Sequence, residues 1–295
     1  MEGLRSRLQH RLPIIGDGGM GSALFERGLD PGDCPESVNL TRLELLEEIA
    51  RLYREAGAEI IQTNTFGGSP LKLASYGLDG QCEEINARAV QAARKVAGKE
   101  AYVVASCGPS GRTLKPYGDT EPGAIRESFA RQMTALVAAG IDGICLETMT
   151  DLQEARLAIE AAREARGGGE FPIMATMTFD ATPRGFFTIM GVDIPAAAAG
   201  LAEAGAEVVG SNCGNGIDNM VKIARRFLEV TDLPIIIQSN AGLPVIEDGR
   251  AVYPESPAFM AERAREMITA GVSIIGGCCG TTPDHIRALK ELIDG

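Results

Sequence analysis

The sequence predicts a (β/α)8 barrel, an α/β TIM barrel, formed as a single domain over residues 1–295. Short apolar runs alternate with longer segments rich in Ala, Leu, Glu and Arg, and no linker or low-complexity tract interrupts them. Alternating strands and helices are typical of a parallel sheet, and about 250 residues are enough to close such a sheet into a barrel.

Eight strands are expected, each a β-rich apolar run; they cover residues 12–16, 58–64, 101–107, 141–148, 171–179, 206–213, 233–240 and 272–279. Helical periodicity marks the segments between them, most clearly 43–57, 85–98, 151–165 and 258–271. Several of these segments end in Ala-Gly before the next strand, as at Gly57 and Gly271. Glycine there supplies the left-handed residue that ends a helix.

Composition limits the function. A formal net charge of -12 disfavours nucleic acid and anionic membrane surfaces as partners. The first apolar run is too short for a signal peptide or a membrane span, so a cytoplasmic location is expected. The sequence has no tryptophan and only 5% aromatic residues, and therefore lacks the usual material for a cage around a quaternary ammonium ligand.

The residues at the carboxyl ends of barrel strands carry the chemistry of this fold. Here these positions are polar and rich in thiols: Asp17, Thr63, Asn64, Glu147, Asn212, Cys213, Asn240, Cys278 and Cys279. The longer loops after the third and fifth strands are expected to cover the same face. The two histidines, His10 and His285, are expected at the surface, which leaves no imidazole base in the site.

Three cysteines form the most specific pattern. Cys213 ends the sixth strand and Cys278 and Cys279 end the eighth, so one strand separates them and their thiolates can meet at one point. Zinc favours such ligands, and three of them leave a fourth tetrahedral position open, as in catalytic sites. The remaining cysteines are expected in the core: Cys34, Cys82, Cys107 and Cys145. A disulfide between Cys278 and Cys279 is the alternative, which a reducing cytosol disfavours.

A zinc ion bound by three thiolates is electron-rich, and it would deprotonate a bound thiol yet leave that sulfur reactive, which implies S-alkylation. Thr282 and Pro283 predict a helix start beside the cysteines, either as an aid to the thiolates or as a plain capped helix. Asp17 and Glu147 suit a substrate ammonium, or else serve as ordinary caps or ion-pair partners. The glycines at 16–21 match a dinucleotide motif weakly and favour close substrate approach instead.

The chain resembles the homocysteine S-methyltransferase family over essentially its whole length. The resemblance is carried by DGGMGSAL, QTNTFGG, ETMTDLQEA, GSNCGNG, QSNAG and GGCCGTTPDHI. The family includes betaine–homocysteine methyltransferase and the homocysteine-binding module of cobalamin-dependent methionine synthase. The cysteine motifs are the specific part of the match.

The resemblance implies a zinc site at Cys213, Cys278 and Cys279, with the sulfur of homocysteine as the fourth ligand. It also implies that the amino-acid end of homocysteine is held by four residues: Asp17, Gly18, Thr63 and Glu147. Phe66 and Asn240 are the other residues expected to bind substrate. Asn240 corresponds to an asparagine beside the metal, which fills the fourth position before substrate arrives. Glu147 and Asn240 join the cysteines as expected catalytic residues.

The expected methyl donor is a methylcorrinoid such as methylcobalamin, bound free or on a corrinoid protein in trans, with methionine and Co(I) as products. Betaine is disfavoured because Gly67-Gly68 stands where betaine enzymes carry a bulky aromatic residue. No folate domain or DxHxxG cobalamin motif occurs before the last residue, Gly295. S-methylmethionine is the alternative donor. Two other functions stay open: a phosphate-binding barrel lyase or isomerase, and a non-catalytic protein that binds zinc or a corrinoid partner.

Overall fold

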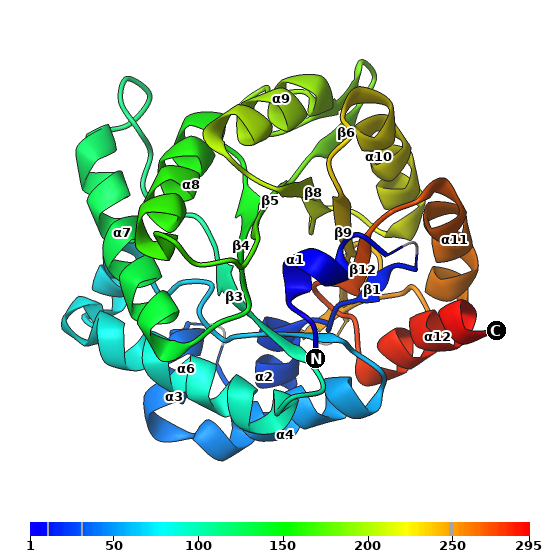
Figure 1. The fold of residues 1–295 in the computed structure, drawn as a ribbon, viewed down its shortest axis with the longest axis horizontal. Helices are drawn as coiled ribbons and strands as arrows, with labels where there is room; N and C mark the ends of the chain where they lie inside the picture. The colour runs from blue at the N-terminus through cyan, green and yellow to red at the C-terminus, as the bar shows by residue number, and fades with distance from the viewer. Residues whose placement is uncertain (11, 31, 248–249) are drawn as a thin grey trace.

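The computed structural model describes residues 1–10, 12–30, 32–247 and 250–295. In this part of the chain, eight parallel strands form one sheet inside a ring of helices (Figure 1). In spatial order they are β1 (Ile14–Ile15), β12 (Ile274–Gly277), β9 (Ile235–Ser239), β8 (Val208–Asn212), β5 (Ile173–Met177), β4 (Gly143–Met149), β3 (Tyr102–Cys107) and β2 (Ile60–Gln62). The Glu59 amide donates a 2.8 Å hydrogen bond to the Ile15 carbonyl and joins β2 to β1. The predicted (β/α)8 barrel is confirmed.

The helices lie outside the strands and largely match the predicted segments. The segments at 43–57, 85–98, 151–165 and 258–271 form α4 (Leu43–Glu55), α6 (Cys82–Ala97), α8 (Leu152–Arg166) and α11 (Pro257–Ala270). The ring also contains α2 (Met20–Glu26), α3 (Val38–Thr41), α5 (Pro70–Leu73), α7 (Pro122–Ala139), α9 (Ile194–Ala204), α10 (Ile217–Val230) and α12 (Pro283–Asp294). Within the described ranges, no helix has both the length and the apolar character needed to cross a membrane.

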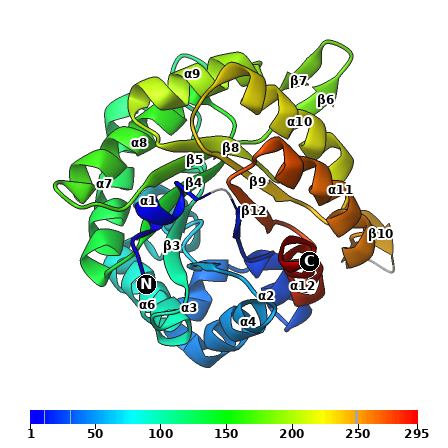
Figure 2. The same ribbon diagram turned by 45° about the vertical axis from the view of Figure 1, so that its right-hand side comes forward.

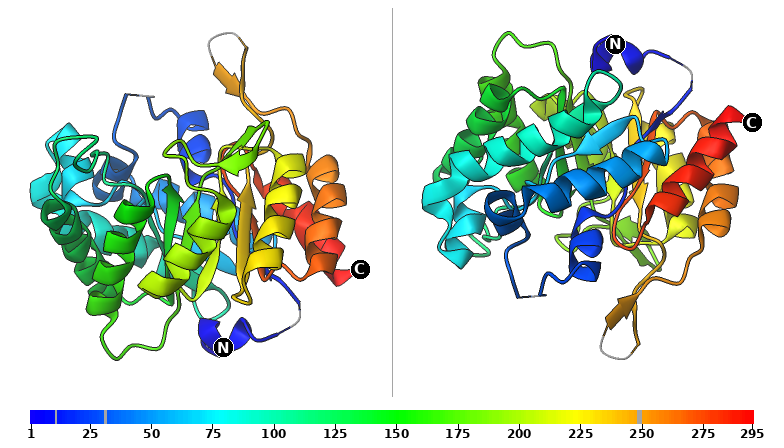
Figure 3. Two further views of the ribbon diagram at one scale, coloured as in Figure 1. Left: turned by 90° about the horizontal axis from the view of Figure 1, so that it is seen from above. Right: turned by 90° about the horizontal axis from the view of Figure 1, so that it is seen from below.

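Two antiparallel hairpins interrupt the alternation and were not expected from the sequence. One, β6 (Asp180–Thr182) with β7 (Gly185–Phe187), follows β5 and projects beyond the helix ring (Figure 2). The other, β10 (Val245–Glu247) with β11 (Arg250–Val252), follows β9. It stands at the end of the barrel opposite the N-terminal helix α1 (Leu4–Arg7), as Figure 3 shows. Both hairpins are short and largely exposed. The sequence therefore lacks, in these segments, the apolar alternation by which a half-buried strand is predicted.

Side chains that face the barrel interior change from apolar to polar along the strands. Leu4 and Leu8 close one end by packing on the inward residues Ile14, Ile60, Tyr102, Val104, Cys145, Met174, Val208, Ile236 and Ile274. Two residues further along their strands, the inward positions are polar: Gln62, Ser106, Glu147, Thr176 and Gln238, with Asn212 two residues beyond Gly210. The interior is therefore apolar at the amino ends of the strands and polar toward their carboxyl ends.

Candidate metal centre

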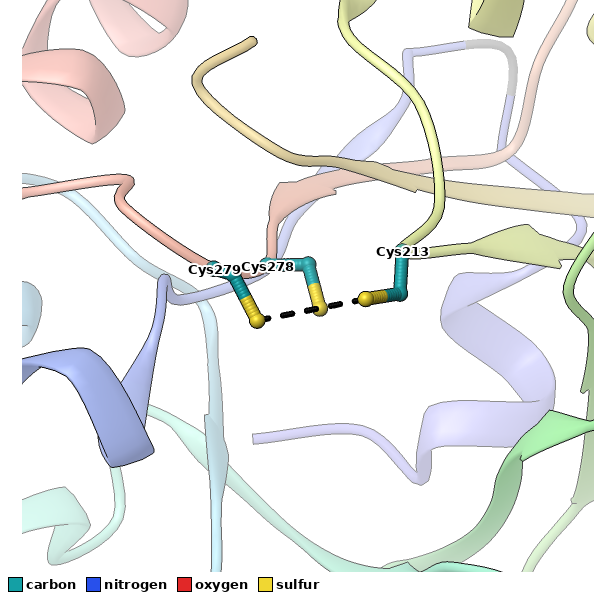
Figure 4. Close-up of side chains that lie close together, drawn as sticks. All are labelled: Cys213, Cys278 and Cys279. Atoms are coloured by element: carbon teal, nitrogen blue, oxygen red, sulfur yellow. Dashed lines mark hydrogen bonds between the residues drawn. The ribbon is translucent and has the colours of Figure 1, made fainter. Parts of the chain in front are cut away.

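The sulfurs of Cys213, Cys278 and Cys279 point toward one another at the carboxyl ends of β8 and β12 (Figure 4). All three lie within 4.8 Å of one another, and Cys213 Sγ is 3.9 Å from Cys279 Sγ. Only β9 lies between these two strands, as expected. Tetrahedral ligands about 2.3 Å from a zinc ion lie about 3.8 Å apart. The donor set therefore fits zinc in both chemistry and spacing, and all three thiols are free.

The backbone turns sharply at Cys213, directly after β8. Cys213 has a φ of 59°, a left-handed conformation that few residues other than glycine adopt. Its amide donates to the Gln238 carbonyl at 3.1 Å, and the Cys278 amide donates to the Ser239 carbonyl at 2.7 Å. Both cysteine positions are thus fixed by β9, the strand between them. The predicted strands 206–213 and 272–279 end before these cysteines because the chain leaves the ladder here.

Hydrogen bonds among the three thiols distribute charge unequally. Hydrogen bonds from Cys278 and Cys279 lower the pKa of Cys213 well below that of an ordinary thiol. Hydrogen bonds with Cys213 and Cys279 raise the pKa of Cys278. The hydrogen bond with Cys213 raises the pKa of Cys279. Cys213 is therefore the most acidic of the three thiols.

Two side chains support Cys279. Asn240 Oδ1 accepts a 3.2 Å hydrogen bond from the Cys279 amide, and the Asn240 side chain also hydrogen-bonds to Cys213 and lowers its pKa. Asn240 thus lies beside the sulfur cluster, where the resemblance placed it, with its carbonyl oxygen already engaged. Tyr253 shares a hydrogen bond with Cys279, and its ring occupies the space beside Gly280, where a Cβ would lie 2.0 Å from the ring.

The helix next to the cysteines begins as predicted. Thr282 caps α12, Pro283 occupies its first turn, and the His285 side chain completes a capping box with Thr282. His285 Nε2 also lies 2.9 Å from the Glu255 carbonyl. The surface position expected for His285 is therefore wrong: the residue is buried, and both ring nitrogens have hydrogen-bond partners in the protein. His10 is exposed, as expected.

Two buried carboxyl groups face the polar interior. Asp17 Oδ2 accepts a 2.7 Å hydrogen bond from the backbone amide of Gln62, while Oδ1 is buried without a partner. Glu147 accepts hydrogen bonds from the Ser106 hydroxyl and from Asn212 Nδ2, the latter at 3.4 Å. The pKa of both groups is raised to about 7, mainly by burial, and the charge of Glu147 contributes to the rise at Asp17. No cation among the described residues contributes to either pKa. Neither carboxylate caps the helix that follows it, because Gly19 is the N-cap of α2 and Asp151 caps α8.

Two other residues expected at the substrate, Gly18 and Thr63, make close contacts within the protein. A Cβ at Gly18 would lie 2.7 Å from the Tyr53 ring and 2.8 Å from Thr281 Oγ1, so tight packing requires glycine there. Thr63 Oγ1 lies 2.6 Å from Thr65 Oγ1 and accepts a 3.3 Å hydrogen bond from the Ser106 amide. Its hydroxyl thus ties the end of β2 to β3.

Phe66 lies at the edge of this region. Its ring covers Gly108, where a Cβ would come within 2.4 Å of it, and 37% of the residue is exposed. The Gly108 amide donates a 2.8 Å hydrogen bond to the Phe66 carbonyl. The structure therefore fixes Phe66 between the loops after β2 and β3.

Residues 14–293 match the family model described as homocysteine S-methyltransferase. The chain belongs to the homocysteine S-methyltransferase family. This finding confirms both the resemblance and the enzyme class expected from the sequence. The four other cysteines of this family member, Cys34, Cys82, Cys107 and Cys145, are buried, as a core role predicts.

Three kinds of known protein are similar to this family member. The methionine synthases of Mycobacterium leprae and Mycobacterium tuberculosis are both 34% identical over 95% of this chain, which spans only 24% of their length. The metallated form of the homocysteine methyltransferase MmuM from Escherichia coli is 25% identical, with a TM-score of 0.79 over 98% of this chain and 99% of that one. The carboxyl transferase domain of Rhizobium etli pyruvate carboxylase, 14% identical with a TM-score of 0.57, shares the fold.

Two inward-facing polar residues of this homocysteine S-methyltransferase family member were not expected from the sequence: Gln62 and Gln238. Each lies on the inward face of its strand, two residues after an apolar residue of the barrel interior. The two-residue alternation of a strand was the signal that could have found them. Tyr253, which follows an unpredicted hairpin, carried no such signal.

Proposed function

We propose that this chain transfers a methyl group to the thiol of homocysteine, forming methionine, with a zinc ion held by Cys213, Cys278 and Cys279. The convergence of these three sulfurs within 4.8 Å carries the proposal. Zinc held by three thiolates lowers the pKa of an added thiol ligand and keeps its sulfur nucleophilic at neutral pH.

The protein residues orient the acceptor for this reaction. Asp17 Oδ1 is a buried acceptor without a partner, and Glu147 lies in the same polar layer. A substrate ammonium would pair with both carboxylates and return their raised pKa values toward the ordinary range. Thr63 and Phe66 then shape the walls of the substrate site and offer no free polar atoms to the substrate. Gly18 contributes by leaving room for the side chains of Tyr53 and Thr281.

The methyl donor we propose is a methylcorrinoid, either free or carried by a partner protein. The likeness to methionine synthases supports this choice. Packing at Gly68 supports the exclusion of betaine, because a Cβ there would lie 2.5 Å from Asn86 Oδ1 and 2.9 Å from Gln132 Nε2. The bulky aromatic residue of betaine enzymes has no room at this position.

One assay tests both parts of the proposal. Zinc-loaded protein and homocysteine are offered methylcobalamin, S-methylmethionine and betaine in parallel, and methionine is measured. Methionine from methylcobalamin is expected; methionine from S-methylmethionine alone would refute the corrinoid donor but keep the enzyme class. Methionine from none of the donors would refute the proposed reaction.

Substitution of a ligand tests the metal. Cys213→Ala is expected to abolish zinc binding and turnover together, whereas Cys107→Ala, a matched change at a buried core cysteine, should preserve both. Full zinc content and full activity in Cys213→Ala would refute the assignment.

A further inference from the structure

Two glutamines meet inside the barrel although 176 residues separate them. Gln238 Nε2 on β9 donates a 2.8 Å hydrogen bond to Gln62 Oε1 on β2, across the intervening strands β12 and β1. The inward positions at this level of β12 and β1 are Gly276, which pairs with Gln238, and Gly16, two residues after Ile14. Because neither glycine has a side chain, the two amides can reach each other.

The hydrogen bonds determine which way each amide points. The Gln62 side chain hydrogen-bonds to Glu147 and lowers its pKa, as a donor to a carboxylate does. Its nitrogen is therefore directed to Glu147, and its oxygen is free to accept from Gln238 Nε2. Gln238 Oε1 is then left over. This oxygen is buried, since Gln238 is only 3% exposed, and it has no hydrogen-bond partner.

A second orphaned acceptor belongs to a residue that contacts Gln62. Asp17 Oδ1 is also buried without a partner, while Asp17 Oδ2 accepts a hydrogen bond from the backbone amide of Gln62. Gln62 therefore contacts all three side chains that offer acceptor atoms: Asp17, Glu147 and Gln238. A buried acceptor without a donor is costly. Two such acceptors on residues that both contact Gln62 indicate a ligand that brings several donors.

We propose that Gln238 Oε1 is a specificity-determining contact, which together with Asp17 Oδ1 and the Glu147 carboxylate binds the α-ammonium group of an amino-acid thiol. An ammonium group has three N–H donors and no acceptor, so it can satisfy three acceptors at once. Gln238 thereby restricts the acceptor substrate to thiols that carry an amino group. This inference rests on the proposed function, since it concerns how that site selects its thiol.

The experiment compares three thiols by isothermal titration calorimetry on zinc-loaded protein: homocysteine, 4-mercaptobutanoate, which lacks the amino group, and 3-mercaptopropylamine, which lacks the carboxylate. Gln238→Met keeps the side-chain volume and removes the acceptor. It should weaken both amino thiols about tenfold or more, the value of a hydrogen bond to a charged group, and leave 4-mercaptobutanoate unchanged.

Gln153→Met is the matched control, because Gln153 is exposed in the first turn of α8. Zinc content and melting temperature are measured for each variant to establish that the site is intact. An equal loss for all three thiols, or no loss for any, would overturn the role of Gln238. Wild-type protein that binds zinc but none of the thiols would instead refute the proposed function.

Discussion

The side chain of Asn212 holds the backbone of Thr148 in a left-handed conformation. Asn212 Oδ1 accepts from the Thr148 amide at 2.7 Å, and Nδ2 donates to Thr148 Oγ1 at 2.8 Å. Thr148 has a φ of 60°, which is strained for a β-branched residue. Because Thr148 follows Glu147, this contact also fixes the direction of a buried carboxylate in the proposed substrate site.

Replacement of this side chain should therefore affect stability. Asn212→Ala removes the contacts with Thr148 and a 2.7 Å hydrogen bond from Thr176 Oγ1, leaving buried groups unpaired. We expect a loss of about 3 kcal/mol in the free energy of unfolding, measured by urea denaturation. Asn219→Ala removes a hydrogen bond to Asn215 and an exposed 3.4 Å hydrogen bond from Lys222 on a half-buried helix face, and it should cost less than about 1 kcal/mol. Equal costs would contradict the role of Asn212.

The raised pKa of Asp17 predicts a pH dependence of stability. Its ordinary value is 3.8 and its value in the folded chain is about 7, so the folded state holds an extra proton between these limits. The contribution of Asp17 to the free energy of unfolding therefore falls as pH rises from about 4 to 7. Asp17→Asn should remove this loss and make the substrate-free protein more stable at pH 8, by at most about 4 kcal/mol.

The measurement is urea denaturation at pH 5 and pH 8, with equal metal loading of both proteins. The difference between variant and wild type should be larger at pH 8. Asp232→Asn, an exposed position, should leave the profile unchanged. Equal destabilisation of the variant at both pH values would show that ionisation of the buried Asp17 carboxyl does not destabilise the folded state.

Metal binding should release protons. The pKa of Cys213 is lowered and those of Cys278 and Cys279 are raised, so two thiols lose protons when zinc binds. We expect release of about two protons per zinc near pH 7, measured by calorimetry in buffers of different ionisation enthalpy. Removal of zinc with a chelator should lower the melting temperature by mass action. Cys107→Ala should behave as wild type, and release of no protons would contradict the thiol assignment.

Contact between β8 and β9 requires glycine at position 210. A Cβ on Gly210 would lie 1.8 Å from the Ile236 carbonyl oxygen, a backbone atom that cannot move without breaking the sheet. Gly210→Ala should cost about 3 kcal/mol or more, or prevent folding. Gly123→Ala is the matched control: no heavy atom lies within 4 Å of its Cβ position on α7, and we expect a gain of about 0.5–1 kcal/mol by urea denaturation. A tolerated Gly210→Ala would contradict the described strand packing.

The strand pattern and the three cysteines could be read from the sequence because each depends on a local rule. Apolar runs alternating with helical segments indicate a parallel barrel, and the carboxyl ends of its strands meet at one face. Cys213, Cys278 and Cys279 follow their strands directly, so the topology alone brings their sulfurs together. The same rule placed Asp17 and Glu147 at the polar end of the barrel.

The tertiary structure alone decided which of these polar groups contact each other. The hydrogen bond between Gln62 and Gln238 depends on the register of four strands and on the gap left by two glycines. The hydrogen bonds between Asn212 and Thr148 depend on a left-handed residue within β4, and burial of His285 depends on a carbonyl near the start of α11. A two-residue alternation in the sequence shows that a side chain points inward, but the partner it meets is determined by strand register and barrel closure.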